Sequence, residues 1–236
     1  MVSKTVSTTI DGLFFGKIEA RWEGRPPSAI GKTTVDGLRQ IKANGFVEDA
    51  QADLDNHGGA EKAIHHYPSD HYAAWMAEGV IPEGTVPAAF GENISAYGLT
   101  EDTVCIGDVF QFGSAIVQIS QGRQPCWKVA EHTSNSRMAY LFQKTGRTGW
   151  YYRVIENGKA GRSSEIRLLE RPQPDWTVKR VTQARLFRNP TPSEAETLSN
   201  LPELAQDWRD AFAKMAGGDT EEDTSRRLEG LPDQPE

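Results

Sequence analysis

The sequence predicts a β-rich α+β fold, a β-barrel or sandwich with a few helices, followed by a small three-helix unit. Short β-branched and aromatic runs, separated by Gly- and Pro-containing turns, fill most of residues 10–170. This pattern is typical of barrels and sandwiches and not of repeating βαβ units. A Pro-rich break at 171–174 then leads into residues with helical periodicity alone.

Length and composition limit the function classes. The 236 residues can form one large domain with an appendix, and 37% hydrophobic residues are enough for a packed core. A net charge of -7, from 26 basic and 33 acidic side chains, argues against binding to nucleic-acid polymers or anionic membranes. No run has membrane-spanning length, and the N-terminus lacks a signal-like apolar core. Two cysteines make no disulfide framework and fit no zinc spacing, so we expect a reduced, cytoplasmic protein.

The elements expected in the first half of the chain are two strands and a helix. The strands are predicted at 13–18 and 29–35, the second closed by a turn at Asp36-Gly37. The helix is predicted after Ser69, with apolar residues at 72, 75 and 76, and it ends at Gly79.

The second half is expected to supply more strands and a second helix. Strands are predicted at 104–112, with a bulge or tight bend at 106–108, and at 116–119. A helix capped by Ser134 or Asn135 ends at Gly146. Strands at 150–154 and 166–169 are expected to be joined by a hairpin turn at Asn157-Gly158.

The C-terminal part is expected to be helical and then disordered. Helices are predicted at 177–187, 193–199 and 203–215, and the acidic tail is predicted to be disordered. The predicted divisions are 1–172 for the β domain, 173–216 for the helical domain and 217–236 for the tail.

Cys126 lies in a setting that favours thiolate chemistry. It follows the β-branched run 116–119 and a turn, so we expect it in a loop just past a strand end. Arg123 and Lys128 flank it with positive charge, which favours the thiolate, the form that attacks electrophiles and binds soft metals. A lone cysteine is most often a small buried hydrophobe, and we interpret Cys105, in an apolar stretch, in that way.

A glycine pair follows His57 and precedes Lys62. It could form an anion- or cofactor-binding loop, or an ordinary turn with surface histidines, and spacing alone favours the turn. A zinc site formed by the nearby histidines is disfavoured. His66 and His71 are five residues apart, and no His-Glu-x-x-His pattern is present.

Several short motifs occur in a specific order along the chain. They include Pro27-Ser28-Ala29-Ile30, His57-Gly58-Gly59, Tyr67-Pro68, Phe90-Gly91-Glu92-Asn93, Ile106-Gly107-Asp108, Pro125-Cys126 and Tyr152-Arg153-Val154-Ile155. Together they resemble the MOSC-domain family, named after the C-terminal part of molybdenum-cofactor sulfurases, and within it the YiiM-like subgroup. The resemblance covers residues 10–170, and the three C-terminal helices match that subgroup's appendix.

The resemblance implies a MOSC-type β-barrel with a pocket for a molybdenum cofactor, in which molybdenum is bound to a pterin. Cys126 is then the protein ligand to molybdenum, and His57 is the second catalytic residue, a proton relay. The implied cofactor-binding residues are Asn93, Gln121, Arg123, Lys128, Arg153 and Lys62. Thiolate is a soft ligand, and an anionic cofactor needs such cationic partners. Lys62 stands where the subgroup usually has Arg, so it offers a point charge in place of a bidentate fork.

The same resemblance implies reduction of N-hydroxylated small molecules, such as detoxification of hydroxylaminopurine. The chain has no Cys cluster for an iron–sulfur centre and no Gly-x-Gly-x-x-Gly loop. We therefore expect a separate electron-donating reductase, a flavoprotein, as partner. Two alternatives stay open: a module that carries the cofactor, or sulfur upon it, without turnover, and a metal-free thiol that acts as a redox or transfer nucleophile. The sequence does not predict the oligomeric state.

Overall fold

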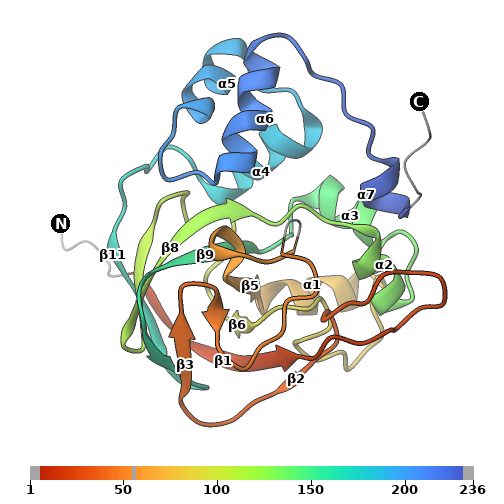
Figure 1. The fold of residues 1–236 in the computed structure, drawn as a ribbon, viewed down its shortest axis with the longest axis vertical. Helices are drawn as coiled ribbons and strands as arrows, with labels where there is room; N and C mark the ends of the chain where they lie inside the picture. The colour runs from red at the N-terminus through yellow and green to blue at the C-terminus, as the bar shows by residue number, and fades with distance from the viewer. Residues whose placement is uncertain (1–5, 55–56, 231–236) are drawn as a thin grey trace.

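Seven strands form a closed barrel (Figure 1). The computed structural model describes residues 6–54 and 57–230. The strands follow the order β11-β7-β8-β9-β5-β6-β1, β1 pairs back to β11, and β2 extends the sheet beside β1. Their bounds are β1 (Ser7–Gly16), β2 (Lys32–Thr34), β5 (Ile64–Pro68), β6 (Ile94–Ala96), β7 (Val109–Phe112), β8 (Ala115–Gly122), β9 (Trp150–Glu156) and β11 (Glu165–Glu170). The predicted β-rich fold is confirmed, as a barrel and not a sandwich.

One pairing in the barrel is parallel, that between β5 and β6. Parallel neighbours need a crossover connection, commonly a helix. Helix α1 (Asp70–Ala77) lies in this crossover, as the apolar spacing after Ser69 predicts. The other barrel pairings are antiparallel.

A small second sheet corrects the predicted hairpin at Asn157-Gly158. It consists of β3 (Arg39–Lys42), β4 (Gly45–Phe46) and β10 (Gly158–Ala160), with β10 paired to β3. The chain therefore continues from β9 into β10, and β11 pairs with β7 and β1 instead of returning along β9. Gly158 allows its backbone to pass close to the backbone of Ala115 and does not form the predicted turn. A Cβ at this position would lie 2.4 Å from the backbone nitrogen of Ala115.

The helices largely follow the predictions. They are the 3-10 helix η1 (Ala60–Lys62), α1, α2 (Trp127–Thr133), α3 (Met138–Thr145), α4 (Val178–Phe187), α5 (Pro192–Ser199), α6 (Gln206–Ala216) and α7 (Ser225–Glu229). Gly146 ends α3 with φ of 72°, a conformation that glycine adopts without steric cost. Helix α2 was not predicted, because its seven residues are too few to show a clear helical period.

Helices α4 to α6 lie across β8 and β9 at one end of the barrel (Figure 1). Thr177 caps α4 by accepting from the Arg180 backbone N–H, and Thr191 with Glu194 forms a capping box on α5. Trp208 belongs to the same buried apolar cluster as the barrel interior. The break predicted at 172–173 is therefore a change of secondary structure within one continuous core. No helix in the described ranges is long and apolar enough to cross a bilayer.

The described part of the predicted disordered tail, residues 217–230, contacts the rest of the chain. This part carries α7, and Leu228 packs against a buried cluster. Arg227 donates a 2.8 Å hydrogen bond to the Pro125 carbonyl. These contacts anchor a segment whose polar composition alone favours disorder. Residues 231–236 of the predicted tail lie outside the described residues.

Strand β5 separates two environments. Ile64 belongs to the barrel core, and His66 Nδ1 lies 3.0 Å from the Tyr152 hydroxyl in that core. Tyr67 belongs to a second, aromatic cluster packed with α1 and α3. His65 lines a cavity on this outer face. The period-two alternation of a strand thus sends the adjacent histidines to opposite sides.

Candidate functional site

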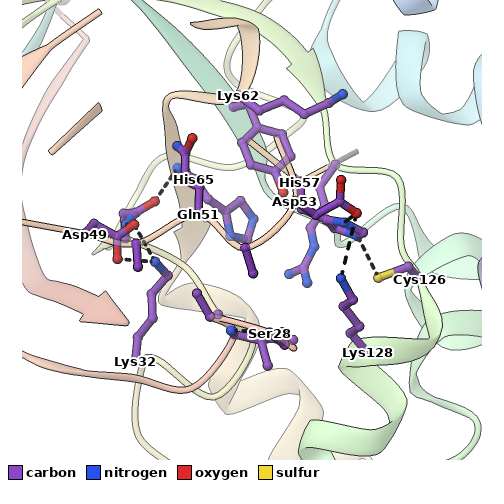
Figure 2. Close-up of a pocket in the computed structure, with 18 residues that line it drawn as sticks. Ser28, Lys32, Asp49, Gln51, Asp53, His57, Lys62, His65, Cys126 and Lys128 are labelled. Atoms are coloured by element: carbon purple, nitrogen blue, oxygen red, sulfur yellow. Dashed lines mark hydrogen bonds and ion pairs between the residues drawn. The ribbon is translucent and has the colours of Figure 1, made fainter. Parts of the chain in front are cut away.

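A cavity lies on the outer face of the barrel, between β5, β9 and the start of α2 (Figure 2). Its free volume is about 80 Å³. Basic side chains dominate its walls, namely Lys32, His57, Lys62, His65, Arg123 and Lys128. Two carboxylates, Asp49 and Asp53, the phenol of Tyr151 and the thiol of Cys126 complete the ionisable lining. The cavity is therefore suited to anionic groups.

Cys126 is placed at the cavity wall by the way β8 ends. Gly122 closes β8, and a Cβ there would lie 1.9 Å from Thr182 Oγ1, so glycine allows α4 to pack against the strand end. Pro125 then precedes Cys126, which is the N-cap residue of α2. Cys126 is only 7% exposed. The predicted loop position just past a strand is confirmed, and the helix that follows is the part that sequence reasoning missed.

His57 and Asp53 hold the thiol in an ionisable unit. His57 Nε2 lies 3.2 Å from Cys126 Sγ, and His57 Nδ1 lies 3.1 Å from Asp53 Oδ2. Burial opposes the thiolate, but the charge and hydrogen bond of His57, with the charge of Arg123, lower the pKa of Cys126 to about 6. Burial also opposes protonation of His57, yet Cys126 and Asp53 outweigh it and raise the pKa of His57. A thiolate facing an imidazolium is the favoured state.

His65 behaves in the opposite way. It is buried, and burial together with the charge of Arg123 lowers the pKa of His65 well below its usual range. His65 therefore stays neutral at physiological pH, whereas the pKa of His57 is raised. The environments of the two imidazoles push their pKa values apart, so His57 holds a proton more strongly than His65 does.

Arg123 and Lys128 are both at the cavity, as predicted. Arg123 Nη1 donates a 2.7 Å hydrogen bond to the Phe90 carbonyl, and its guanidinium lies 5.6 Å from the centre of the Phe142 ring. Lys128 is 5% exposed, and its Nζ lies 4.0 Å from Asp53 Oδ2. Both cations are held on the Cys126 side of the cavity and cannot be screened fully by solvent.

The opposite wall is built around a buried ion pair that sequence reasoning missed (Figure 2). Lys32 Nζ lies 2.6 and 2.7 Å from the two oxygens of Asp49. Asn93, a predicted site residue, donates to Asp49 Oδ2 at 2.7 Å and accepts from the His65 backbone N–H at 3.0 Å. Asn93 therefore orders the wall. The available signal was Lys32 inside a predicted strand, since a lysine on a buried face needs a partner.

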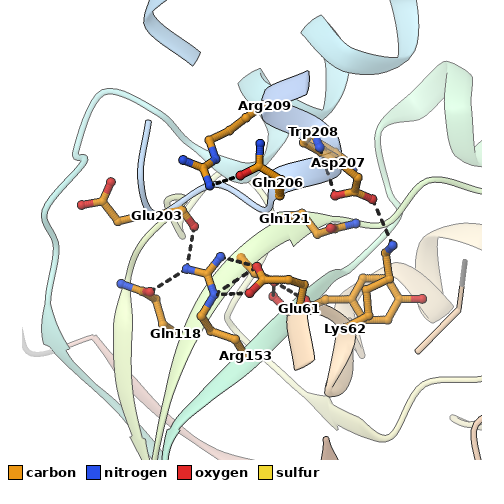
Figure 3. A network of polar contacts seen from close by, with 12 residues as sticks. Glu61, Lys62, Gln118, Gln121, Arg153, Glu203, Gln206, Asp207, Trp208 and Arg209 are labelled. Atoms are coloured by element: carbon orange, nitrogen blue, oxygen red, sulfur yellow. Dashed lines mark hydrogen bonds and ion pairs between the residues drawn. The ribbon is translucent and has the colours of Figure 1, made fainter. Parts of the chain in front are cut away.

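Arg153, a predicted cofactor-binding residue, does not line the cavity, and its guanidinium has other partners (Figure 3). It contacts Glu61 at 3.1 Å, Gln118 at 2.8 Å and the Glu203 carbonyl at 2.9 Å. Arg153 shares a strand face with the cavity residue Tyr151 but lies two residues, about 6.6 Å, further along β9. That distance places it under the segment that leads into α6.

Gln121 is also outside the cavity lining. Its amide lies between β8 and α6, where it can donate to Asp207 Oδ1 and accept from Trp208 Nε1, each at 3.1 Å (Figure 3). Lys62 does line the cavity, as predicted, but its Nζ pairs with Asp207 Oδ2 at 3.0 Å. Asp207 is about half exposed, so this pair is weak and leaves Lys62 able to change partners.

His66, His71 and Cys105 lie in structural settings away from the cavity. His66 lies in the barrel core, and His71 Nε2 lies 2.6 Å from Glu101 Oε2. Within the described residues, no group of three or more His, Cys, Asp or Glu side chains is arranged to hold a metal ion. Cys105 is buried in the core, as predicted, and burial with the charge of Asp108 raises its thiol pKa to about 11.

The donor set of the cavity fits a molybdenum cofactor. Cys126 supplies an ionised sulfur, the kind of ligand that soft thiolate-binding centres take. Arg123, Lys128 and Lys62 supply the cationic donors that an anionic cofactor requires. The free volume is enough for several water molecules, so a pterin cofactor would extend beyond it.

Comparisons with known proteins agree with this fold and site. Residues 53–167 match the MOSC domain model. The chain is 38% identical to the protein YiiM of Escherichia coli over 221 residues, which cover 92% of this chain and 97% of that protein. It is 35% identical over 182 residues to a protein named reductase from Gibberella moniliformis, covering 76% of this chain and 32% of that one.

A solved structure extends the agreement to three dimensions. The crystal structure of YiiM from Geobacillus stearothermophilus superposes with a TM-score of 0.75 at 29% identity, covering 89% of this chain and all of that one. With near-complete coverage of a YiiM protein, the barrel and the C-terminal helices belong to the shared architecture. This chain is a member of the MOSC-domain family and of the group within it that contains YiiM.

Proposed function

We propose that this chain is a molybdenum-cofactor-dependent reductase of N-hydroxylated compounds, with Cys126 as the protein ligand to molybdenum. The observation that carries the proposal is the Cys126 thiolate, a soft donor 3.2 Å from His57 at the wall of a basic cavity. Metal binding to a thiol requires its deprotonation. A thiol whose pKa is lowered to about 6 is already deprotonated at neutral pH.

The chain's basic side chains account for cofactor binding in this proposal. Arg123, Lys128 and Lys62 hold the anionic parts of the cofactor through charge-assisted hydrogen bonds. Asn93 acts indirectly, because its amide is engaged by Asp49 and by the His65 backbone. Lys62 changes partner from the exposed carboxylate of Asp207 to the ligand.

Reduction of a hydroxylamine to an amine consumes two electrons and two protons and releases water. When bound, a molybdenum cofactor supplies the two electrons. His57 supplies a proton from Nε2, because its raised pKa keeps it protonated and Asp53 orients the ring through Nδ1. Neutral His65 cannot take this role. The partly exposed His57 can regain its proton from solvent.

The electrons reach the site from a partner in this proposal. The sequence has two cysteines, too few to hold an iron–sulfur cluster, and no dinucleotide-binding glycine motif. We therefore propose a separate electron-donating reductase, a flavoprotein, and a reducing cytoplasmic setting for the two free thiols. The fungal relative named reductase matches this module over only 32% of its length, which is compatible with redox parts that lie outside the module.

A second candidate function is a metal-free thiol nucleophile. The Asp53–His57–Cys126 arrangement favours it, since a nucleophile, a base and an orienting carboxylate within hydrogen-bond reach define activated thiols. This candidate needs no molybdenum. A metal-free thiol nucleophile would leave the cations Lys128 and Lys62 in the cavity lining without a role. The reductase is therefore preferred.

Turnover distinguishes the candidates. The assay loads the protein with cofactor in a cofactor-producing host and measures reduction of N-hydroxylated bases, such as hydroxylaminopurine, with an artificial electron donor. Wild type and Cys105→Ser should reduce the substrate, and Cys126→Ser should not. Full activity in folded Cys126→Ser would exclude the ligand role. Bound cofactor without reduction by any donor would indicate the carrier function.

A further inference from the structure

The last described segment of the chain runs alongside the Cys126 loop. We call residues 222–230 the C-terminal strap. Gln124 donates to Glu222 Oε1 at 3.3 Å, and Arg227 Nη1 donates to the Pro125 carbonyl at 2.8 Å. On the other side of Cys126, the strap packs against Trp127, because a Cβ on Gly230 would lie 2.9 Å from the Trp127 ring. The strap thus contacts residues on both sides of the thiol.

The strap is itself anchored to elements outside the Cys126 loop. Glu222 accepts a 3.0 Å hydrogen bond from Arg185 of α4, a side chain that is nearly buried. Arg227 Nη2 donates to Gln143 of α3 at 3.2 Å. Leu228 packs against the aromatic cluster that includes Tyr67 and Phe142. Helices α3 and α4 therefore fix the position of the C-terminal strap, and the strap in turn can hold the Cys126 loop in place.

Arg227 holds the loop at the peptide unit directly before Cys126. The Pro125 carbonyl and the Cys126 backbone nitrogen belong to one planar peptide unit. A donor that holds the carbonyl therefore also holds the backbone nitrogen of Cys126, which limits rotation at its Cα. Because Cys126 must keep its Sγ 3.2 Å from His57 Nε2, a small rotation of this peptide would break the contact.

We propose that Arg227 is a positioning residue for Cys126. Through Pro125 it holds the peptide before the thiol, and so keeps Sγ aimed at His57 and buried in the cavity wall. The role is independent of the reaction in which the thiol takes part. It also gives the C-terminal strap a function that its polar, acidic sequence does not suggest.

The test measures access to the thiol in the full-length, cofactor-free protein. Cys126 alkylation by a small reagent, iodoacetamide, and by a bulky maleimide is followed by mass spectrometry of its peptide. The reactions run at pH 9, and the ratio of the maleimide rate to the iodoacetamide rate reports access, because both reagents react with the same thiolate. Arg227→Met should accelerate the bulky reagent by about tenfold, the population change expected from losing one charge-assisted hydrogen bond.

Matched variants separate positioning from general loss of structure. Arg227→Lys keeps one donor and should lie nearer to wild type than Arg227→Met. Arg180→Met removes an exposed, Glu194-paired cation from α4, away from the strap, and should leave the rate unchanged. Thermal unfolding identifies folded variants, and if Arg227→Met does not fold, Glu222→Gln should still accelerate the bulky reagent. Wild-type rates in folded Arg227→Met, or in folded Glu222→Gln when it replaces that variant, would overturn the proposal.

Discussion

The imidazole of His57 and the thiol of Cys126 form one ionisable unit across a 3.2 Å contact. The two residues are 69 positions apart in the chain, and the barrel brings them together between η1 and α2. Each group favours the charged form of the other, so the pair resists the neutral state that burial would otherwise impose. The chemistry proposed above depends on this pair.

The first prediction concerns the pH dependence of Cys126 alkylation. Only the thiolate reacts, and the pKa of Cys126 is lowered to about 6, so the rate should be constant above pH 7. Below pH 6 it should fall about tenfold per pH unit, because protonation removes the thiolate. Iodoacetamide kinetics from pH 4.5 to 9 in cofactor-free protein measure this. Cys105, buried and with pKa raised to about 11, is the internal control and should not react. A Cys126 midpoint above pH 8 would contradict the ion pair.

The second prediction concerns Asp53. Replacing it with Asn removes the carboxylate that helps raise the pKa of His57. A less protonated His57 stabilises the thiolate less, so the midpoint of Cys126 alkylation should rise by up to about one pH unit. The control is Asp102→Asn, which removes an exposed carboxylate paired with Lys179 far from the cavity. Identical midpoints for the two variants would show that Asp53 does not help to raise the pKa of His57.

The third prediction concerns the ion pair on the opposite wall. Asp49 accepts from Lys32, Asn93 and the Gly16 backbone, and its side chain is 6% exposed. Asp49→Ala should lower the free energy of unfolding by about 3–5 kcal/mol, because it leaves a buried ammonium uncompensated.

The matched control is the double variant Asp49→Ala with Lys32→Met, measured by urea unfolding. It should recover part of the loss, since no uncompensated charge remains. If the double variant is less stable than the single variant, the loss does not come from the lone charge of Lys32.

The fourth prediction contrasts two arginines that the sequence analysis assigned to the same pocket. Arg153→Met should destabilise the protein by about 1–3 kcal/mol through loss of its contacts to Glu61, Gln118 and the Glu203 carbonyl. It should leave the alkylation midpoint of Cys126 unchanged. Arg123→Met should raise that midpoint, because the charge of Arg123 helps lower the thiol pKa. Equal effects on the midpoint would contradict the placement of Arg153 away from Cys126.

Local patterns predicted much of the fold. Alternation in β9 put Trp150 and Tyr152 inside the barrel, and the period after Ser69 marked α1. The partners of each strand were less accessible, because pairing depends on closure between β1 and β11 across the whole chain. Asn157-Gly158 shows the consequence, since a strong turn dipeptide was used for close packing beside Ala115.

The candidate site was predictable where chemistry and neighbours coincide along the chain. Cys126 lies within six residues of sequence that also contain Arg123 and Lys128, and the positive charges of these two side chains predicted that Cys126 favours the thiolate. The sequence could not place Arg153 outside the cavity lining, because a step of two residues along one strand face decides between the cavity and α6. The Lys32–Asp49 pair was missed because its partners come from separate segments and meet only in the fold.

The most direct test of the central claim is the molybdenum and pterin content of protein purified anaerobically from a host that makes the cofactor. Wild type and Cys105→Ser should carry near-stoichiometric molybdenum, and Cys126→Ser should carry none while remaining folded. Molybdenum in Cys126→Ser equal to wild type would contradict the assignment of Cys126 as ligand. Absence of molybdenum and pterin from wild type, in a host where a known molybdoenzyme loads normally, would contradict the reductase and favour the metal-free thiol.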